Sequence, residues 1–249
     1  MRKDNRIGEV NKNYQGLQMV IIAYRNRRDI DVEFSDGYVA HNVRYANFLE
    51  GSITSNLYPQ YLGVGYFGIG KYKSRINGIK TPEYICWSSM LTRCYSDKYI
   101  KKDNYIACSV CEEWHNFQKF AEWYQNNTYA LENDVLELDK DIIQKGNKLY
   151  SPDMCMLVPH KINTIICNRH NDRGRCYIGV RETKRGYVAV CNIDRKPKCL
   201  GIYPTEIEAF YAYKTAKEAE IKRVAELYRG IIPAFIIEYI TKYKIELTD

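Results

Sequence analysis

The stretch that decides the fold lies near the C-terminus, at Tyr177–Tyr228, and reads YIGVRETKRGYVAVCNIDRKPKCLGIYPTEIEAFYAYKTAKEAEIKRVAELY. Alternating apolar and polar residues predict three short strands, at about 177–182, 186–193 and 197–203. Thr205 and Glu208 have the spacing of a capping box, so a helix is expected to begin there and to run to about Tyr228. The apolar side of this helix is formed by Ile207, Phe210, Tyr213, Ala216, Ile221 and Val224. The stretch therefore predicts a three-stranded antiparallel sheet covered by one helix.

This predicted sheet is strongly basic. Between Arg173 and Lys198 the chain has eight Lys and Arg residues, against Glu182 and Asp194 as the acids. Because side chains alternate along a strand, the expected outward residues are Arg181, Thr183, Arg185, Tyr187 and Ala189, and residues of the other parity are expected to pack on the helix. A basic three-stranded sheet can enter the major groove of DNA, where Arg reads guanine and Lys neutralises phosphate. The alternative is a solvated basic sheet that packs on another part of the protein. The candidate DNA-binding residues are Arg181, Thr183, Lys184, Arg185, Tyr187, Arg195, Lys196 and Lys198.

The order of motifs in this stretch resembles the Apetala-type (ethylene-response-factor) DNA-binding domain. A Gly-Val-Arg opens the first strand, an aromatic-x-Ala lies in the second, and Leu-Gly-x-aromatic ends the third, before Thr-x-x-Glu-Ala at the helix start. Tyr187 and Cys199 stand where that family usually has Trp. The resemblance implies sequence-selective binding to double-stranded DNA.

The middle of the chain carries five spaced motifs over about 75 residues. They are Trp87-x-x-Met90-Leu91-x-Arg93-Cys94, Val110-Cys111-x-x-Trp114-x-x-Phe117-x-x-Phe120, Leu138-Asp139-Lys140-Asp141-Ile142, Tyr150-Ser151-Pro152-x-x-Cys155 and Val158-Pro159-x-x-Ile162-Asn163. This pattern resembles the phage-type HNH (ββα-metal) homing endonucleases, in which such a core is often joined to a DNA-binding module. The resemblance implies a DNA endonuclease that uses Mg²⁺ or Mn²⁺ and no small-molecule cofactor.

The resemblance also implies the site residues. Asp139 matches the metal-binding Asp, Asn163 matches the helix ligand, and Lys140 stands where the family has its His base. A Lys is a poor base unless burial lowers its pKa, but as a cation it can stabilise the transition state. Asp141, expected on the same strand face as Asp139, is a second candidate ligand or base, and His160 is a candidate base from the helix.

A different class of function stays open beside the endonuclease. Without an effective base, the core would be a catalytically inactive HNH-like scaffold in a DNA-binding regulator, or in a phage protein that acts against a host system. The plainest interpretation of Asp139 and Asp141 is a strand end with solvated carboxylates.

The chain has nine Cys residues, an unusually high number for its length. Cys108-x-x-Cys111, with Cys94 before it and Cys155 after it, is a candidate structural zinc site. Small buried thiols are the alternative, because a single CxxC is only half of the usual zinc signature.

The N-terminal part predicts a small β-rich unit. Residues 1–16 are polar and are expected to be frayed, and then MVIIAY (19–24) and IDVEF (30–34) predict strands joined by a charged turn. Gly63–Gly70 lacks the Lys-Ser/Thr of a phosphate-binding loop, so we interpret it as a turn. The arginines Arg25, Arg27 and Arg28 cluster in the charged turn, and they predict either an accessory contact with DNA phosphate or a solvated hairpin tip.

The whole chain of 249 residues is expected to be a three-part α+β protein, with segments at 1–80, 81–170 and 175–249. Residues 168–174 are expected to be a polar linker. Residues 1–80 hold 12 basic and 7 acidic side chains, 81–172 hold 10 and 13, and 173–249 hold 15 and 10. Basic flanks around a slightly acidic middle suit a bound polyanion and a central carboxylate site. No signal peptide or apolar run of 18 residues is present, which favours the cytoplasm, that of a bacterial host if the chain is phage-encoded as the resemblance implies.

Overall fold

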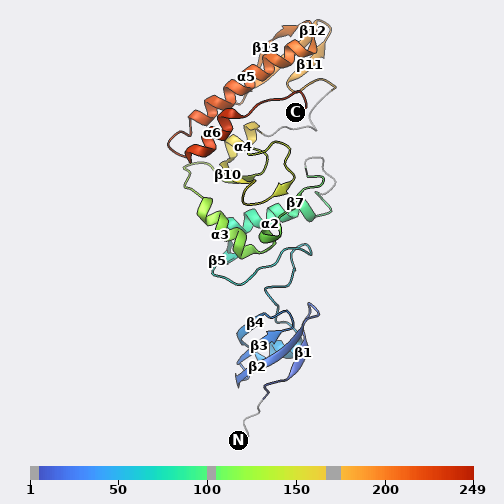
Figure 1. Cartoon of the computed structure of the whole chain (residues 1–249), viewed down its shortest axis with the longest axis vertical. Coiled ribbons are helices and arrows are strands. Elements are labelled where there is room, and N and C mark those ends of the chain that lie inside the picture. Colours follow the sequence, from blue (N-terminus) through green and yellow to red (C-terminus); the bar gives the residue numbers. More distant parts are fainter. Residues whose placement is uncertain (1–5, 100–104, 167–174) are drawn as a thin grey trace. The chain divides into compact units, whose positions relative to one another are not determined.

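The computed structural model describes residues 6–99, 105–166 and 175–249, and it has the helices and separate sheets of an α+β protein (Figure 1). The chain divides into two compact units, Met1–Asn126 and Asn127–Asp249. The boundary therefore falls inside the segment 81–170 that was expected to be one part. The expected linker at 168–174 lies outside the described residues. None of the described helices is long and apolar enough to cross a membrane.

The first unit begins with a four-stranded antiparallel meander, followed by one short helix. The elements are β1 (Val10–Lys12), β2 (Gln18–Asn26), β3 (Asp29–Phe34), β4 (Val39–Val43) and α1 (Tyr45–Glu50). Alternate residues of β2 and β3, together with Phe48 of α1, form a fully buried core. The expected strands at 19–24 and 30–34 are confirmed. The expectation that residues 1–16 are frayed is wrong for Val10–Lys12, because these residues pair with Gln18–Val20.

Short strands and longer helices follow in the described part of the first unit. The elements are β5 (Arg75–Ile76), β6 (Ile79–Lys80), α2 (Pro82–Tyr95), β7 (Ser109–Val110), the 3₁₀ turn η1 (Glu112–His115) and α3 (Phe117–Asn127). The aromatic residues Trp114, Phe117 and Phe120 are fully buried. Their spacing of three is that of one helix face, but the chain forms η1 first and then α3 as a separate helix. The Asn116 side chain accepts a hydrogen bond from the Gln118 amide at 2.9 Å and starts α3 separately.

The glycine-rich segment Gly63–Gly70 is a loop that lies against α2 and α3. A Cβ at Gly65 would stand 2.5 Å from the Leu91 side chain, and one at Gly68 or Gly70 would clash with a side chain of α3 or of the residue before it. The buried Gln118 closes this arrangement, because it accepts from the Tyr72 amide and donates to the Tyr72 carbonyl, both at 2.9 Å. These glycines permit close packing of the backbone, which agrees with the interpretation as a turn.

The second unit consists of a ββα segment and the predicted sheet with its helices. The elements are β8 (Leu136–Asp139), β9 (Leu149–Tyr150), β10 (Met156–Pro159), α4 (His160–Ile166), β11 (Val180–Thr183), β12 (Gly186–Ile193), β13 (Lys196–Tyr203), α5 (Glu206–Glu226) and α6 (Ala234–Lys242). The sheet order is β11-β12-β13, and α5 lies across it (Figure 1). The expected three strands and the following helix are confirmed.

The helix α5 begins as its sequence predicts. The Thr205 hydroxyl accepts from the Glu208 amide at 3.3 Å, and the Glu208 carboxylate accepts from the Thr205 amide at 3.1 Å. Phe210, Tyr213 and Ile221 are buried against the sheet, whereas Ile207, also expected on the apolar side, is 46% exposed.

Gly179 packs directly under α5, and we expect Gly179→Ala to destabilise the second unit. The residue has a φ of +74°, and an added Cβ would clash with the buried ring of Tyr213. The left-handed backbone and the overpacking together cost about 2–5 kcal/mol. Gly146→Ala is the matched control, because Gly146 has the same φ but open space around it, so its cost is about 1–2 kcal/mol. Urea unfolding of both variants measures the difference, and equal costs would show that the contact with Tyr213 is unimportant.

Candidate functional site

The segment expected to carry the chemistry folds as strand, loop, antiparallel strand and helix. β8 pairs with β10, with Glu137 opposite Val158 and Asp139 opposite Met156. α4 begins at His160, directly after β10 ends. Because side chains alternate along a strand, Glu137 and Asp139 lie on the same face of β8.

Asp139 is buried at the end of β8 and closes the turn that follows. Its Oδ1 atom accepts from the amides of Asp141 at 2.8 Å and Ile142 at 2.7 Å. Burial raises the pKa of the Asp139 carboxyl to about 6, although the two amide hydrogen bonds act in the opposite direction. The carboxylate is therefore desolvated and fixed in position.

Lys140 is also buried, and its amine holds the loop together. Nζ donates to the Asp141 carboxylate at 2.7 Å and to the backbone carbonyl of Asn147 at 2.6 Å. The side-chain amide of Asn147 donates in turn to the backbone carbonyl of Lys140 at 3.0 Å. The two contacts of Nζ hold the Lys140 amine within the loop, where it shapes the turn after β8. The expectation that Asp141 extends the face of Asp139 is wrong, because β8 ends at Asp139 and Asp141 lies in the turn.

Two residues of α4 converge on Glu137 of β8. His160 Nδ1 lies 2.8 Å from Glu137 Oε1, and Asn163 Nδ2 donates to Glu137 Oε2 at 2.6 Å. The side chains of His160 and Glu137 are 53% and 38% exposed, so the pair lies at the surface. A carboxylate accepts hydrogen bonds, so we assign the hydrogen of this contact to Nδ1, while Nε2 lies 3.4 Å from the Thr164 hydroxyl. The sequence interpretation missed Glu137, although it lies two residues before Asp139 on the same strand face.

The predicted metal ligands can be compared with the needs of a divalent cation. Mg²⁺ prefers oxygen ligands and is commonly held by one or two protein groups together with water and substrate phosphate. Asp139 offers a carboxylate and Asn163 an amide, and Glu137, which is hydrogen-bonded to Asn163, shares the strand face of Asp139. Across residues 6–99, 105–166 and 175–249, no three His, Cys, Asp or Glu side chains form a metal-binding group. The donors fit Mg²⁺ or Mn²⁺ in kind, with the substrate supplying much of the coordination.

The predicted zinc ligands are divided between the two units. Cys94, Cys108 and Cys111 belong to the first unit and Cys155 to the second, and all except the partly buried Cys111 are buried. Burial raises the pKa of the Cys111 thiol. The described part of the first unit does not bring three Cys or His side chains together as a metal group. The zinc site stays a prediction.

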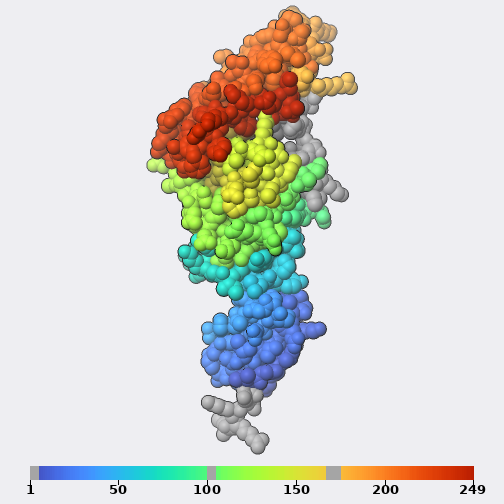
Figure 2. All heavy atoms as spheres, in the orientation of Figure 1, coloured from blue at the N-terminus to red at the C-terminus, as the bar shows by residue number. Residues whose placement is uncertain are grey.

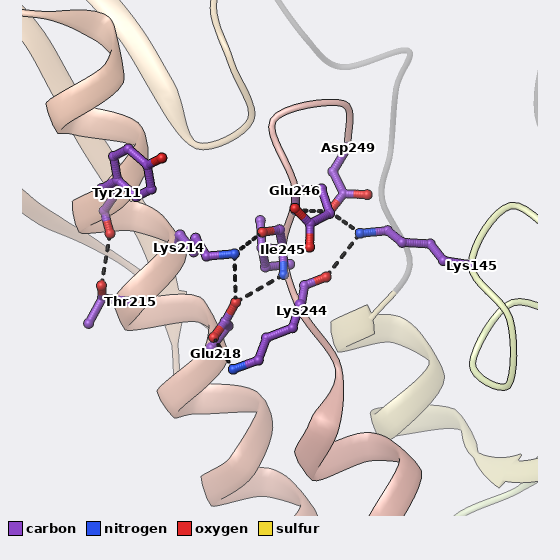
Figure 3. Close-up of polar contacts among 9 residues, drawn as sticks. All are labelled: Lys145, Tyr211, Lys214, Thr215, Glu218, Lys244, Ile245, Glu246 and Asp249. Carbon is purple, nitrogen blue, oxygen red and sulfur yellow. Dashed lines mark hydrogen bonds and ion pairs between the residues drawn. The ribbon is translucent and has the colours of Figure 1, made fainter.

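The loop after Asp139 is anchored to the C-terminal residues (Figure 3). Lys145 donates to the Lys244 carbonyl at 2.9 Å and pairs with the buried Asp249 carboxylate. Glu218 of α5 accepts from the Ile245 amide at 3.1 Å and pairs with Lys244 at 3.1 Å. In Figure 2 the red C-terminal segment lies against the orange helix α5. The candidate site and the helix behind the sheet are thereby connected.

The ββα segment and the sheet also share one hydrophobic core. Met156, Val158 and Ile162 belong to the same buried cluster as Ala189 of β12 and Phe210 of α5. This cluster fixes the position of the candidate site relative to the basic sheet.

The register of the sheet corrects the expected outward face. Val180 pairs with Ala189, and Arg181 pairs with Val188, because the turn between β11 and β12 has only two residues, Lys184 and Arg185. Because of this turn, the side chains that face outward are those of odd-numbered residues on β11 and of even-numbered residues on β12. Tyr187 and Ala189 therefore face α5, and Ala189 is fully buried. Their expected outward position is wrong.

The other candidate DNA-binding residues lie on both sides of the sheet. Arg181 and Thr183 are on the outer face, and Lys184 and Arg185 are in the first turn. Thr183 Oγ1 donates to the Gly186 carbonyl at 2.8 Å, so it shapes that turn. Lys196 and Lys198 pair with Ile193 and Cys191, so they share the helix side, although both are exposed.

The second turn of the sheet is fixed to α5. Asp194 and Arg195 have φ values of 49° and 62°, as a two-residue hairpin turn requires. The Asp194 amide donates to the buried Glu220 carboxylate at 3.0 Å, and Arg223 pairs with both acids. Arg195 is therefore presented from a rigid turn.

A scan against protein-family models and searches of curated proteins and of solved structures found no match to this chain.

Proposed function

We propose that this chain binds duplex DNA through the three-stranded sheet of the second unit and hydrolyses a phosphodiester bond at the ββα segment. The observation that supports the proposal best is the hydrophobic core that joins the two parts. A duplex held on the outer face of the sheet would keep a fixed orientation relative to the ββα segment, which packs on the α5 side of the same sheet. Fixed orientation is the main requirement for a reaction in which substrate and catalytic group must be aligned.

The DNA contacts come from the cations that face away from α5. Arg181 projects from the outer face, and Lys184 and Arg185 extend from the turn beside it. Glu182 pairs with Tyr187 on the helix side of the sheet, so its negative charge does not lie on the outer face beside Arg181. Such cations neutralise phosphates, and Arg can also read the edge of guanine.

Within the site, His160 is the proposed general base. Glu137 accepts a hydrogen bond from Nδ1 and orients the ring, and Nε2, which lies 3.4 Å from the Thr164 hydroxyl, then takes the proton of the attacking water. Asn163 holds the other oxygen of Glu137 and fixes the pair against α4. A divalent cation bound by Asp139 and Asn163 would stabilise the charge on the phosphate and on the leaving oxygen.

His160→Gln is expected to reduce cleavage by about 10²–10⁴-fold, because it removes the base. Glu137→Gln is expected to reduce it by about 10–100-fold, because the His loses its orienting carboxylate. Both should leave duplex affinity unchanged within the error of an anisotropy titration. Glu132→Gln, at an exposed acid of the same unit, is the matched control and should cleave normally. Normal cleavage by His160→Gln would contradict the assignment of the base.

The second candidate function is a DNA-binding protein without nuclease activity. It is favoured by the contacts of Asp139 and Lys140, which satisfy both side chains within the loop itself. Under this function the ββα segment is a scaffold for the sheet. Duplex DNA would then be retarded on a gel but would stay intact with every divalent metal.

A further inference from the structure

The outer face of the three-stranded sheet carries an apolar patch. We define the outer apolar patch as Val188, Val190, Cys199 and Ile202. The register places Val188 between Arg181 and Ile202 on neighbouring strands, and it pairs Val190 with Cys199. Ile202 is 51% exposed and Cys199 is exposed, whereas Val188 is only 5% exposed and Val190 is partly buried, so these two valines form the floor of the patch. None of the four residues belongs to the core that α5 covers.

A bulge in the sheet keeps this patch on the outer face. The register shifts between Ala189 and Val190, where Gly201 adopts a φ of 145°. The extra residue lets Leu200 pack toward the core while Cys199 and Ile202 both face outward. Without the shift, strict alternation would place Cys199 and Ile202 on opposite faces.

Cations border the outer apolar patch. Arg181 is directly beside Val188 in the register, and Lys184 and Arg185 occupy the adjoining turn. The partner that fits this surface has anionic edges with apolar groups between them. The major groove of duplex DNA has this chemistry, because phosphates line it and thymine projects its C5-methyl group into it.

We infer that the outer apolar patch contacts thymine methyl groups in the major groove, so that the sheet selects sites with thymine beside a base pair contacted by Arg181. This inference rests on the proposed binding of duplex DNA and specifies what the sheet reads. Ile202 is the main contact, because it is the most exposed aliphatic side chain of the patch.

The test compares duplexes that differ only in the thymine methyl group. The full chain selects its preferred duplex from a randomised pool, and that duplex is then made with thymine or with uracil throughout. We expect the thymine duplex to bind more tightly by about fourfold for each methyl group contacted. Ile202→Thr should reduce this ratio toward one, and its exposed position should preserve the fold. Ile207→Thr, at an exposed isoleucine of α5, is the matched control and should keep the ratio of the unmodified chain.

Equal affinity of the unmodified chain for the two duplexes would overturn the inference while leaving the proposed DNA binding intact. If Ile202→Thr keeps the preference of the unmodified chain for the thymine duplex over the uracil duplex, the inference is also overturned. Failure to enrich or retard any duplex would instead overturn the proposed function, and the inference with it.

Discussion

Asp139→Asn is expected to reduce metal-dependent DNA cleavage by about 10³-fold or more, while the chain stays folded and binds DNA normally. The substitution removes the anionic ligand of the proposed cation, whose charge stabilises the transition state. Asn keeps an Oδ1 atom that can accept from the amides of Asp141 and Ile142. Asp139→Ala would lose both hydrogen bonds, so a loss of cleavage by that variant would not distinguish a folding defect from a catalytic one. Cleavage and duplex affinity are measured on the same preparation.

The same variant should be at least as stable as the unmodified chain at pH 7. Burial raises the pKa of Asp139 to about 6, above its unfolded value, so the ionised carboxylate opposes folding at neutral pH. The stability advantage of Asp139→Asn over the unmodified chain should decrease as the pH falls through 6. It should vanish near the pKa of Asp in the unfolded chain, about 4. Melting temperatures across this range measure it.

Asp153→Asn is the control for the loss of one acid, because Asp153 is an exposed residue of the same ββα segment. Its cleavage should be normal. Full cleavage by Asp139→Asn would remove Asp139 from the metal site. Binding without cleavage by the unmodified chain, with every divalent metal, would favour the scaffold function.

The double variant Arg181→Ala with Arg185→Ala is expected to lower duplex affinity by about 30–100-fold. The two cations belong to the outer face and to its adjoining turn. The log-log dependence of affinity on salt should become less steep by about 1.8, because each lost phosphate contact contributes about 0.9. Anisotropy titrations at several salt concentrations measure both quantities.

The matched control removes the same charge from the other side of the sheet. Lys196 and Lys198 pair with residues that face α5. Their double replacement by Ala should change the affinity by less than about threefold. Equal losses in the two double variants would show that binding follows net charge rather than the outer face.

The sequence predicted much of the second unit because its signals are local. Alternation, charged turns and the Thr205–Glu208 capping box each act within a few residues, and the strands and α5 lie where they indicate. The orientation of the strands was not predictable in the same way. The two-residue turn Lys184–Arg185 moves Tyr187 to the helix side, and only the pairing register shows it.

The candidate site was predictable only in part. Asp139, His160 and Asn163 were proposed from the family resemblance of their motifs, but the contacts that His160 and Asn163 make depend on strand pairing. Glu137 meets α4 because β10 brings the start of that helix beside β8. The loop contacts of Lys140 likewise depend on Asn147, seven residues further along the chain.

The most direct test of the account is incubation of the purified chain with supercoiled plasmid in Mg²⁺, Mn²⁺ or EDTA, analysed on a gel beside Asp139→Asn. The account predicts retarded DNA in all conditions, and nicks or discrete fragments that require metal and are absent with Asp139→Asn. Plasmid that is neither retarded nor cut in any condition would contradict it.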